Sequence, residues 1–255
     1  MPDVIRLLQF TDTHLMSDPV ATLRGVPTQQ SLAACLAHAR RHGPADLVAV
    51  TGDLVQDDPG GYAPLELLLD GLGAPVLLGP GNHDDPAELR RRLAHPPFQV
   101  GGAWQGDGWL VVMLETWFAD SADGEGRLGP EALARLDDTL RAHADRHALV
   151  LLHHPPLPMD APSLDELGLT DAPDLLEVLG RHGQVRGVGW GHAHQALDVY
   201  RGATRWMCTP STCFQFRPRD PRFESDARPP GYRVLDLHPD GGIASEVVWL
   251  EGWRP

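Results

Sequence analysis

The chain has 255 residues, of which 42% are hydrophobic and 22% are charged, so it is long enough and apolar enough to bury a sizeable core. All 21 basic residues are arginine, and the absence of lysine excludes Walker A phosphate loops and enzymes that form a Schiff base through lysine. The formal net charge of −14 predicts that neither a nucleic acid nor an anionic membrane surface is a partner.

The sequence contains no pattern typical of a signal peptide or of a membrane span. The start of the chain lacks a basic segment, a long apolar run and a small-residue cleavage site. No later apolar run approaches the roughly 20 residues that a membrane helix needs. Cys35, Cys208 and Cys213 form no CxxC pair, so we expect no disulfide framework. These features predict a cytoplasmic protein, and they leave open whether it forms a homodimer.

Short apolar runs alternate with helical patterns along the chain, which predicts an α/β fold, and we expect residues 1–255 to form a single domain. The pattern predicts strands at residues 5–10, 47–50, 76–78, 110–114, 149–152, 185–190, 205–208, 232–237 and 243–249. Helices are expected to start at Thr28 and Asp85, both as N-caps, at Gly129 and at Asp171. The first should end near Gly43 and the last at Gly183, and residues 216–231 should form a long surface loop.

Polar clusters follow five of the predicted strands within a few residues. The clusters lie at residues 12–14, 52–53, 81–84, 153–155 and 191–194. In an open α/β sheet, ligands bind outside the carboxyl ends of the strands, so we expect the five clusters to converge. The glycines at positions 52, 81 and 191 should let the backbone turn sharply after a strand.

The side chains of these clusters suit metal ions. Carboxylate, amide oxygen and imidazole are ligands for Zn, Mn or Fe, and the absence of thiolate argues against a structural zinc site. Each of these motifs on its own more often forms a turn or part of the core than a metal site. Their combination in this order, each after an apolar run, predicts a metal site. If one carboxylate bridges, two divalent ions would each have four protein ligands. The candidate ligands are Asp12, His14, Asp53, Asn82, His153, His192 and His194.

The blocks DTH, GD, GNHD, HxP and GHAH resemble the signature of the calcineurin-like metallophosphoesterases. Segments 23–26, 210–216, 230–232 and 237–241 are similar to one branch, the class III cyclic nucleotide phosphodiesterases of bacteria. The resemblance implies a four-layer α/β/β/α sandwich of two mixed sheets flanked by helices, with the metals at one edge.

The resemblance also implies how the candidate residues divide between two metals. Asp12, His14, Asp53 and His194 would hold the first ion, and Asp53, Asn82, His153 and His192 would hold the second, with Asp53 bridging. His83 would face the phosphate as a catalytic residue, and His83 and Asn82 are expected next to the substrate. His154 follows a candidate ligand, so we expect it either to contact the substrate or a ligand, or to have a structural role beside the two prolines. Asp84 is predicted to orient its loop.

The implied reaction is hydrolysis of a 3′,5′-cyclic nucleotide, above all cAMP to 5′-AMP. A hydroxide bridging the ions would attack phosphorus, and His83 would protonate the leaving oxygen or stabilise the equatorial ones. A broader phosphodiesterase, a phosphomonoesterase or a nucleotide-pyrophosphate hydrolase would fit the same ligands. A non-catalytic metal-binding scaffold is a remote alternative, because no ligand is missing. The family often has Asp-Ser where this chain has Glu115 and Thr116, so the loop over residues 117–127 is expected to shape the pocket differently.

Overall fold

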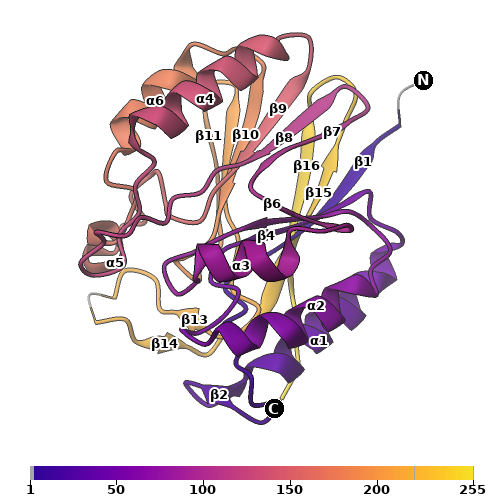
Figure 1. The fold of residues 1–255 in the computed structure, drawn as a ribbon, viewed down its shortest axis with the longest axis vertical. Coiled ribbons are helices and arrows are strands. Elements are labelled where there is room, and N and C mark those ends of the chain that lie inside the picture. Colours follow the sequence, from indigo (N-terminus) through magenta and orange to yellow (C-terminus); the bar gives the residue numbers. More distant parts are fainter. Residues whose placement is uncertain (1–2, 221, 255) are drawn as a thin grey trace.

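The computed structural model describes residues 3–220 and 222–254. Within these ranges two six-stranded sheets pack face to face, and helices cover the outer face of each (Figure 1). This arrangement confirms the predicted α/β/β/α sandwich. None of the described helices is long and apolar enough to cross a membrane.

The first sheet has the strand order β16-β15-β1-β4-β5-β6. Its strands β1 (Ile5–Phe10), β4 (Leu47–Thr51), β5 (Val76–Gly79) and β6 (Phe98–Val100) are parallel. The strands β15 (Gly231–Leu237) and β16 (Ile243–Trp249) add to it in antiparallel fashion. Its outer face is covered by α1 (Thr28–Ala39), α2 (Tyr62–Asp70) and α3 (Pro86–Leu93).

The second sheet has the order β11-β12-β10-β9-β8-β7. Its parallel strands are β8 (Trp109–Met113), β9 (His147–Leu151), β10 (Val185–Trp190) and β12 (Thr204–Cys208), and β7 (Gly102–Gly106) and β11 (Leu197–Arg201) are its antiparallel edges. The helices α4 (Gly129–Ala142) and α6 (Ala172–Gly180) cover its outer face.

The remaining elements are short and lie in the connections. They are β2 (Thr22–Leu23), β3 (Val26–Pro27), α5 (Pro162–Glu166), β13 (Gln215–Phe216), β14 (Ser225–Asp226) and the single turns η1 (Arg40–His42) and η2 (Pro59–Gly61). The strands β13 and β14 pair with each other, and apart from Gln215 they lie within the predicted surface loop at residues 216–231.

Side chains along the central strands alternate between two apolar layers. In β1, Ile5 and Leu7 face the other sheet, whereas Leu8 and Phe10 pack among residues of the covering helices. Because both faces of central strands are buried, β4 (LVAVT) and β8 (WLVVM) are nearly continuous apolar runs rather than alternating ones, and β1 (IRLLQF) is interrupted only by Arg6 and Gln9. This is why the central strands could be predicted from the sequence.

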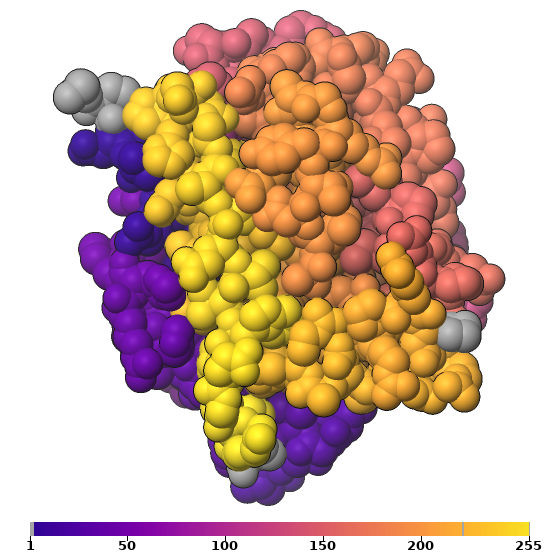
Figure 2. Space-filling view, turned by 180° about the vertical axis from the view of Figure 1, so that it is seen from behind, coloured from indigo at the N-terminus to yellow at the C-terminus, as the bar shows by residue number. Residues whose placement is uncertain are grey.

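The C-terminal strands close the back of the molecule. Figure 2 shows them in yellow, between the N-terminal part in indigo and the orange segment that contains β11 and β12. Arg233 of β15 is fully buried, and its Nη1 donates to Asp198 Oδ2 at 3.0 Å while its Nη2 donates to the Cys208 carbonyl at 2.7 Å. One buried arginine therefore ties the first sheet to β11 and β12 of the second.

The predicted helix starts agree with the structure, but at two of them the side chain does not cap its own helix. Asp85 caps α3 as expected, since its carboxylate accepts from the amides of Ala87 and Glu88. The N-cap prediction for Thr28 is wrong, because Pro27 occupies the N-cap position and no side chain caps α1. Asp171 precedes α6, but its carboxylate accepts from the amide of Gly129 at 2.7 Å and so stabilises the start of α4 instead.

The predicted ends of these helices lie close to the observed ones. The first helix ends at Ala39 and continues as a 3-10 turn to His42, just before Gly43. The last ends at Gly180, three residues before the predicted stop at Gly183. The strands β6, β7 and β11 were not predicted, since β6 is short and the other two mix apolar with polar residues or glycine.

Candidate metal centre

The five polar clusters follow β1, β4, β5, β9 and β10, and their side chains meet where these strands end. Among the described residues, several groups of histidine and aspartate have ligand atoms within 4.8 Å of one another. The groups are Asp12, His14 and His194; Asp12, Asp53 and His153; His14, Asp53 and His83; and His153, His154 and His192. The expected convergence is therefore observed.

One set of ligand atoms gathers around His14. Its Nε2 lies 3.1 Å from Nε2 of His194 and 3.9 Å from Oδ2 of Asp53. Nε2 of His194 lies 3.3 Å from Oδ1 of Asp12. These four side chains are the set that the resemblance assigns to the first ion.

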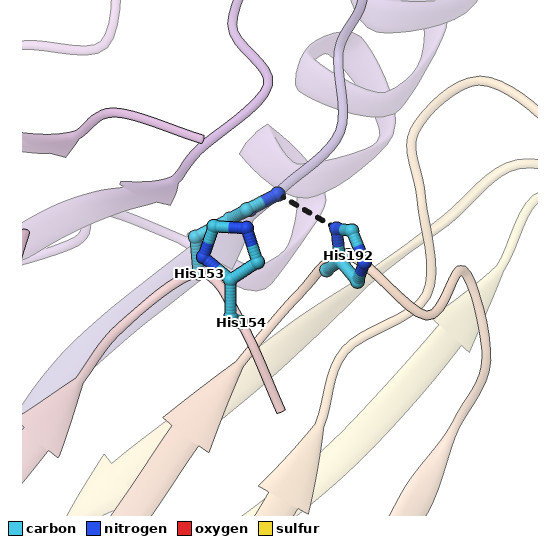
Figure 3. A group of neighbouring side chains, drawn as sticks. All are labelled: His153, His154 and His192. Carbon is cyan, nitrogen blue, oxygen red and sulfur yellow. Dashed lines mark hydrogen bonds between the residues drawn. The ribbon is translucent and has the colours of Figure 1, made fainter. Parts of the chain in front are cut away.

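A second set gathers around His153. Its Nε2 lies 3.4 Å from Oδ1 of Asp53 and 3.2 Å from Oδ1 of Asn82. Nδ1 of His192 lies 3.0 Å from the same Asn82 oxygen and 3.2 Å from Nε2 of His153, the contact dashed in Figure 3. Asp53 thus directs one carboxylate oxygen toward each set.

The ligand atoms of both sets are suited to binding cations. Nδ1 of His194 lies 2.7 Å from the Phe214 carbonyl, and Nδ1 of His153 lies 2.8 Å from the Thr51 carbonyl. Since a carbonyl only accepts, each Nδ1 carries the proton, and Nε2 of the neutral ring presents a lone pair. Lone pairs and oxygens packed this closely repel one another unless a proton or a metal ion lies between them.

The backbone is strained where it presents these ligands. Positive φ is uncommon outside glycine, and each instance costs on the order of 1–3 kcal/mol. The residues concerned are Asp12 (φ 52°), His14 (46°), Asp53 (48°), His192 (63°) and His194 (48°). Hydrogen bonds between the loops hold this geometry, including the amide of His14 to the Asp53 carbonyl at 2.9 Å.

Two glycines next to the ligands leave room for them. Gly52 has φ +93°, as the predicted sharp turn requires, and a Cβ there would overlap the ring of His153. Gly81 does not have positive φ, but a Cβ there would overlap Oδ1 of Asp53 and lie 2.7 Å from Nε2 of His153. Gly81 is therefore needed for close approach rather than for a turn.

Burial and mutual charge shift the pKa values of these groups. Burial raises the pKa of Asp53, but the charge of His153 and its hydrogen bond outweigh this and hold it well below the usual value. Burial lowers the pKa of His14 to about 4 and that of His192 well below its usual value, so both rings are neutral at pH 7.

His153 is the exception among the histidines. Burial lowers its pKa, but the charge of Asp53 and their hydrogen bond raise it to about 9. The ring of His153 and the carboxylate of Asp53 therefore each favour the charged form of the other.

His83 lies beside the ligand sets, with a ring nitrogen within 4.8 Å of ligand atoms of His14 and Asp53. Its Nδ1 lies 3.0 Å from Oδ2 of Asp57, which the sequence did not single out. Burial lowers the pKa of His83, but the charges of Asp53 and Asp57 raise it above its usual value. His83 can therefore carry a proton near neutral pH.

His154 is fully buried, and its ring lies 4.8 Å from those of His153 and His192 (Figure 3). Its Nε2 lies 3.0 Å from the Gly124 carbonyl and its Nδ1 lies 2.6 Å from the Thr116 hydroxyl. Nε2 therefore holds the 117–127 loop next to the ligands, and Nδ1 holds Thr116 just before that loop. Burial lowers the pKa of the ring to about 3.

Asp84 orients its loop, as predicted. Its carboxylate accepts from the amides of Gly81 at 2.8 Å and Leu54 at 3.1 Å and from the hydroxyl of Tyr62 at 3.0 Å. Burial and the charge of Asp53 raise its pKa to about 7. The loop that carries Asn82 is thereby anchored to the segment that follows Asp53.

A cavity of about 310 Å³ adjoins both sets of ligands. Its lining includes His14, Asp53, Asn82, His83, His192 and His194, together with residues that were not predicted as part of the site. The latter include Leu23, Arg24, Leu164, Leu167, Phe214, Phe216 and Phe223. They come from connecting segments, and no periodicity in the sequence places them near the ligands.

Comparison with known proteins gives consistent matches across the chain. The sequence profile of the calcineurin-like phosphoesterase family matches residues 5–196. The chain is 36% identical over 251 residues to the 3′,5′-cyclic adenosine monophosphate phosphodiesterase CpdA of Haemophilus influenzae, covering 97% of this chain and 91% of that protein. It is also 36% identical over 255 residues to CpdA of Escherichia coli, covering 98% and 91%.

Solved structures share the fold at low identity. A dimetal phosphatase from Danio rerio superposes with a TM-score of 0.72 at 12% identity, covering 98% of this chain and 99% of that one. A purple acid phosphatase from yellow lupin gives a TM-score of 0.68 at 12% identity, covering 98% of this chain and 52% of that one.

Proposed function

The chain belongs to the calcineurin-like phosphoesterase family, and from this we propose that it hydrolyses 3′,5′-cyclic nucleotides, above all cAMP to 5′-AMP, at a centre of two divalent ions. The observation that carries the proposal is the position of Asp53, whose two carboxylate oxygens face two separate sets of ligands. The 3′,5′-cyclic substrate is supported by relatives of that activity that match nearly the whole chain.

In this proposal Asp12, His14, Asp53 and His194 hold one ion, and Asp53, Asn82, His153 and His192 hold the other. Mn, Fe and Zn all accept such oxygen and nitrogen ligands. When bound, the ions supply positive charge for the phosphate oxygens and lower the pKa of water at the site.

The chain's own residues position the substrate and move the proton. Asp57 accepts from Nδ1 of His83 at 3.0 Å, which leaves Nε2 as the atom that donates to the leaving 3′-oxygen. Such general acid catalysis typically contributes about 10²–10⁴-fold to the rate. The raised pKa of His83 keeps this proton available near neutral pH.

We also propose which kind of molecule the protein binds and in which compartment it acts. The formal charge of −14 repels a polyanion at long range, whereas a small nucleotide is attracted by the local charge of the ions. We therefore expect the substrate to be a small molecule instead of a nucleic acid. We also expect the enzyme to be cytoplasmic.

A kinetic panel tests the substrate. The purified protein loaded with Mn²⁺ is assayed with 3′,5′-cAMP, 3′,5′-cGMP, 2′,3′-cAMP, bis-p-nitrophenyl phosphate and p-nitrophenyl phosphate. We expect kcat/KM to be highest for a 3′,5′-cyclic nucleotide and activity to be lost on chelation. A higher kcat/KM for 2′,3′-cAMP would contradict the substrate, and a preference for p-nitrophenyl phosphate would favour a phosphomonoesterase that uses the same ligands.

A further inference from the structure

The cavity beside the ligands has a second side that metal chemistry does not use. One side carries the carboxylate, amide and imidazole groups described above. Apart from Arg24, the other side is largely apolar. It comes from three separate connections: the turn between β2 and β3, the segment around α5, and the segment between β12 and β15. In Figure 1, α5 lies at the left with the β13–β14 pair below it, and β2 lies at the bottom. The apolar residues are Leu23, Leu164, Leu167, Phe214, Phe216 and Phe223.

Three phenylalanine rings form a continuous aromatic wall, defined here as Phe214, Phe216 and Phe223. The ring centroids of Phe214 and Phe216 lie 5.1 Å apart, and those of Phe216 and Phe223 lie 5.4 Å apart. The ring of His194 lies 4.5 Å from Phe214 and 4.8 Å from Phe216. The aromatic wall therefore begins at one of the proposed metal ligands.

Arg24 fixes the aromatic wall from the β2–β3 turn. Its guanidinium carbon lies 5.0 Å from the ring centroid of Phe214 and 5.1 Å from that of Phe216. Its Nη1 donates to the carbonyl of Phe223 at 2.7 Å. Arg24 and Phe223 have φ of +50° and +53°, and strain at a bulky residue such as Phe223 persists only where its surroundings hold it in place.

We infer that the aromatic wall binds the base of the nucleotide while the ligand side holds its phosphate, an inference that rests on the function proposed above. A nucleobase is flat and apolar on both faces, and it stacks on aromatic side chains largely without regard to its identity. Phe216 and Phe223 are half-buried and line the cavity. Phe216 lies against the ring of His194, and Phe223 lies one ring further from it.

The size of the cavity favours a small ligand over a polymer or a lipid. About 310 Å³ is at the lower end of the roughly 300–1,000 Å³ typical of small-molecule sites. A mononucleotide combines a phosphate and a flat apolar group within such a volume, which matches the two sides of this cavity. Because stacking tolerates different bases, the aromatic wall selects for the presence of a base more than for adenine.

The test compares two ligands that differ only in the base. Calorimetric titration of the Mn²⁺-loaded protein measures Kd for 5′-AMP and for ribose 5-phosphate, and the ratio of the two isolates the base. We expect wild-type protein to bind 5′-AMP at least about tenfold more tightly than ribose 5-phosphate. Phe223→Ala and Phe216→Leu should each lower this ratio by about tenfold.

The control truncates an aromatic side chain elsewhere. Tyr200 of β11 is 63% exposed and does not line the cavity, so Tyr200→Ala should keep the wild-type ratio. Phe216→Leu keeps apolar volume while removing the ring, and dividing by Kd for ribose 5-phosphate cancels any general damage to the phosphate side. Equal Kd for the two ligands in wild-type protein, or an unchanged ratio in both phenylalanine variants, overturns the inference.

The outcomes for the inference and for the proposed function are separable. A protein that hydrolyses no 3′,5′-cyclic nucleotide but shows the expected ratios refutes the function and keeps the base site. A protein that hydrolyses cAMP with a ratio near one in the wild type keeps the function and refutes the base site.

Discussion

The two sides of the cavity are built from different parts of the chain. The ligand side comes from residues that follow five strands directly, and most of these residues are buried and conformationally strained. The aromatic wall comes from connecting segments, and two of its residues, Phe216 and Phe223, are only half-buried. From this difference we infer a division of roles. The candidate metal ligands are positioned by the ends of the strands, whereas the residues proposed to contact the rest of the substrate come from loops, which vary more easily than the strands do.

The largest expected effect is on the ligand side, at Asp53. Asp53→Ala should empty both metal positions, because one carboxylate serves both sets, and should lower kcat/KM by more than about 10³-fold, beyond the cost of losing a single charge-stabilising group. Elemental analysis of the desalted protein together with the cAMP assay checks this. The control is Asp70→Ala, which removes an exposed carboxylate at the end of α2. One full equivalent of metal retained in Asp53→Ala would argue against the bridge.

His83 separates proton transfer from metal binding. His83→Ala should keep both ions and lower kcat by about 10²–10⁴-fold, because it removes the donor to the leaving oxygen. Metal content and kcat are measured on the same preparation. Loss of metal from this variant would show that His83 is a ligand and that its assigned role is wrong.

Gly81 tests how tightly the ligand side is packed. Gly81→Ala places a methyl group against Asp53 and His153 and should weaken metal binding by about 10–100-fold, as displacement of ligand-supporting groups does. Gly180→Ala is the matched control, since a Cβ there meets nothing within 4 Å. Metal titration of both variants decides the matter, and equal affinities would mean that the ligands have room to move.

The smallest effects are expected in the scaffold outside the cavity. Asp85→Ala removes the cap of α3 and should cost about 1 kcal/mol of unfolding free energy. Thr28→Val should not lower stability, because within the described residues the buried Thr28 hydroxyl has no hydrogen-bond partner and a methyl group in its place is no longer an unpaired polar group. Urea denaturation measures both, and a cost at Thr28 equal to that at Asp85 would restore its role as a cap.

The ligand side could be predicted from sequence because its signals are local. Each ligand follows an apolar run within a few residues, and parallel strands bring their ends to one edge. The double role of Asp53 came from the family resemblance, and the structure adds which oxygen faces which set. Prediction failed at Thr28, where local pattern alone could not show that Pro27 takes the N-cap position.

The aromatic wall could not be predicted, for a physical reason. Arg24 and Phe223 are far apart in the sequence and meet only through tertiary contacts, in backbone conformations that their residue types rarely adopt. Phe214 and Phe216 lie in a segment that the resemblance marked, but nothing in its pattern indicates an aromatic surface. The contact between Asp57 and His83 was missed similarly, since an aspartate after a turn is common.

The most direct test of the central claim, a phosphodiesterase centre of two ions, is metal add-back. Chelated protein receives Mn²⁺ in steps, and bound metal and hydrolysis of 3′,5′-cAMP are measured on the same samples. For a centre of two ions, we expect activity to rise with the second bound equivalent and to reach its plateau at two per chain. Full activity at one equivalent, or no hydrolysis of cAMP at two, would contradict it.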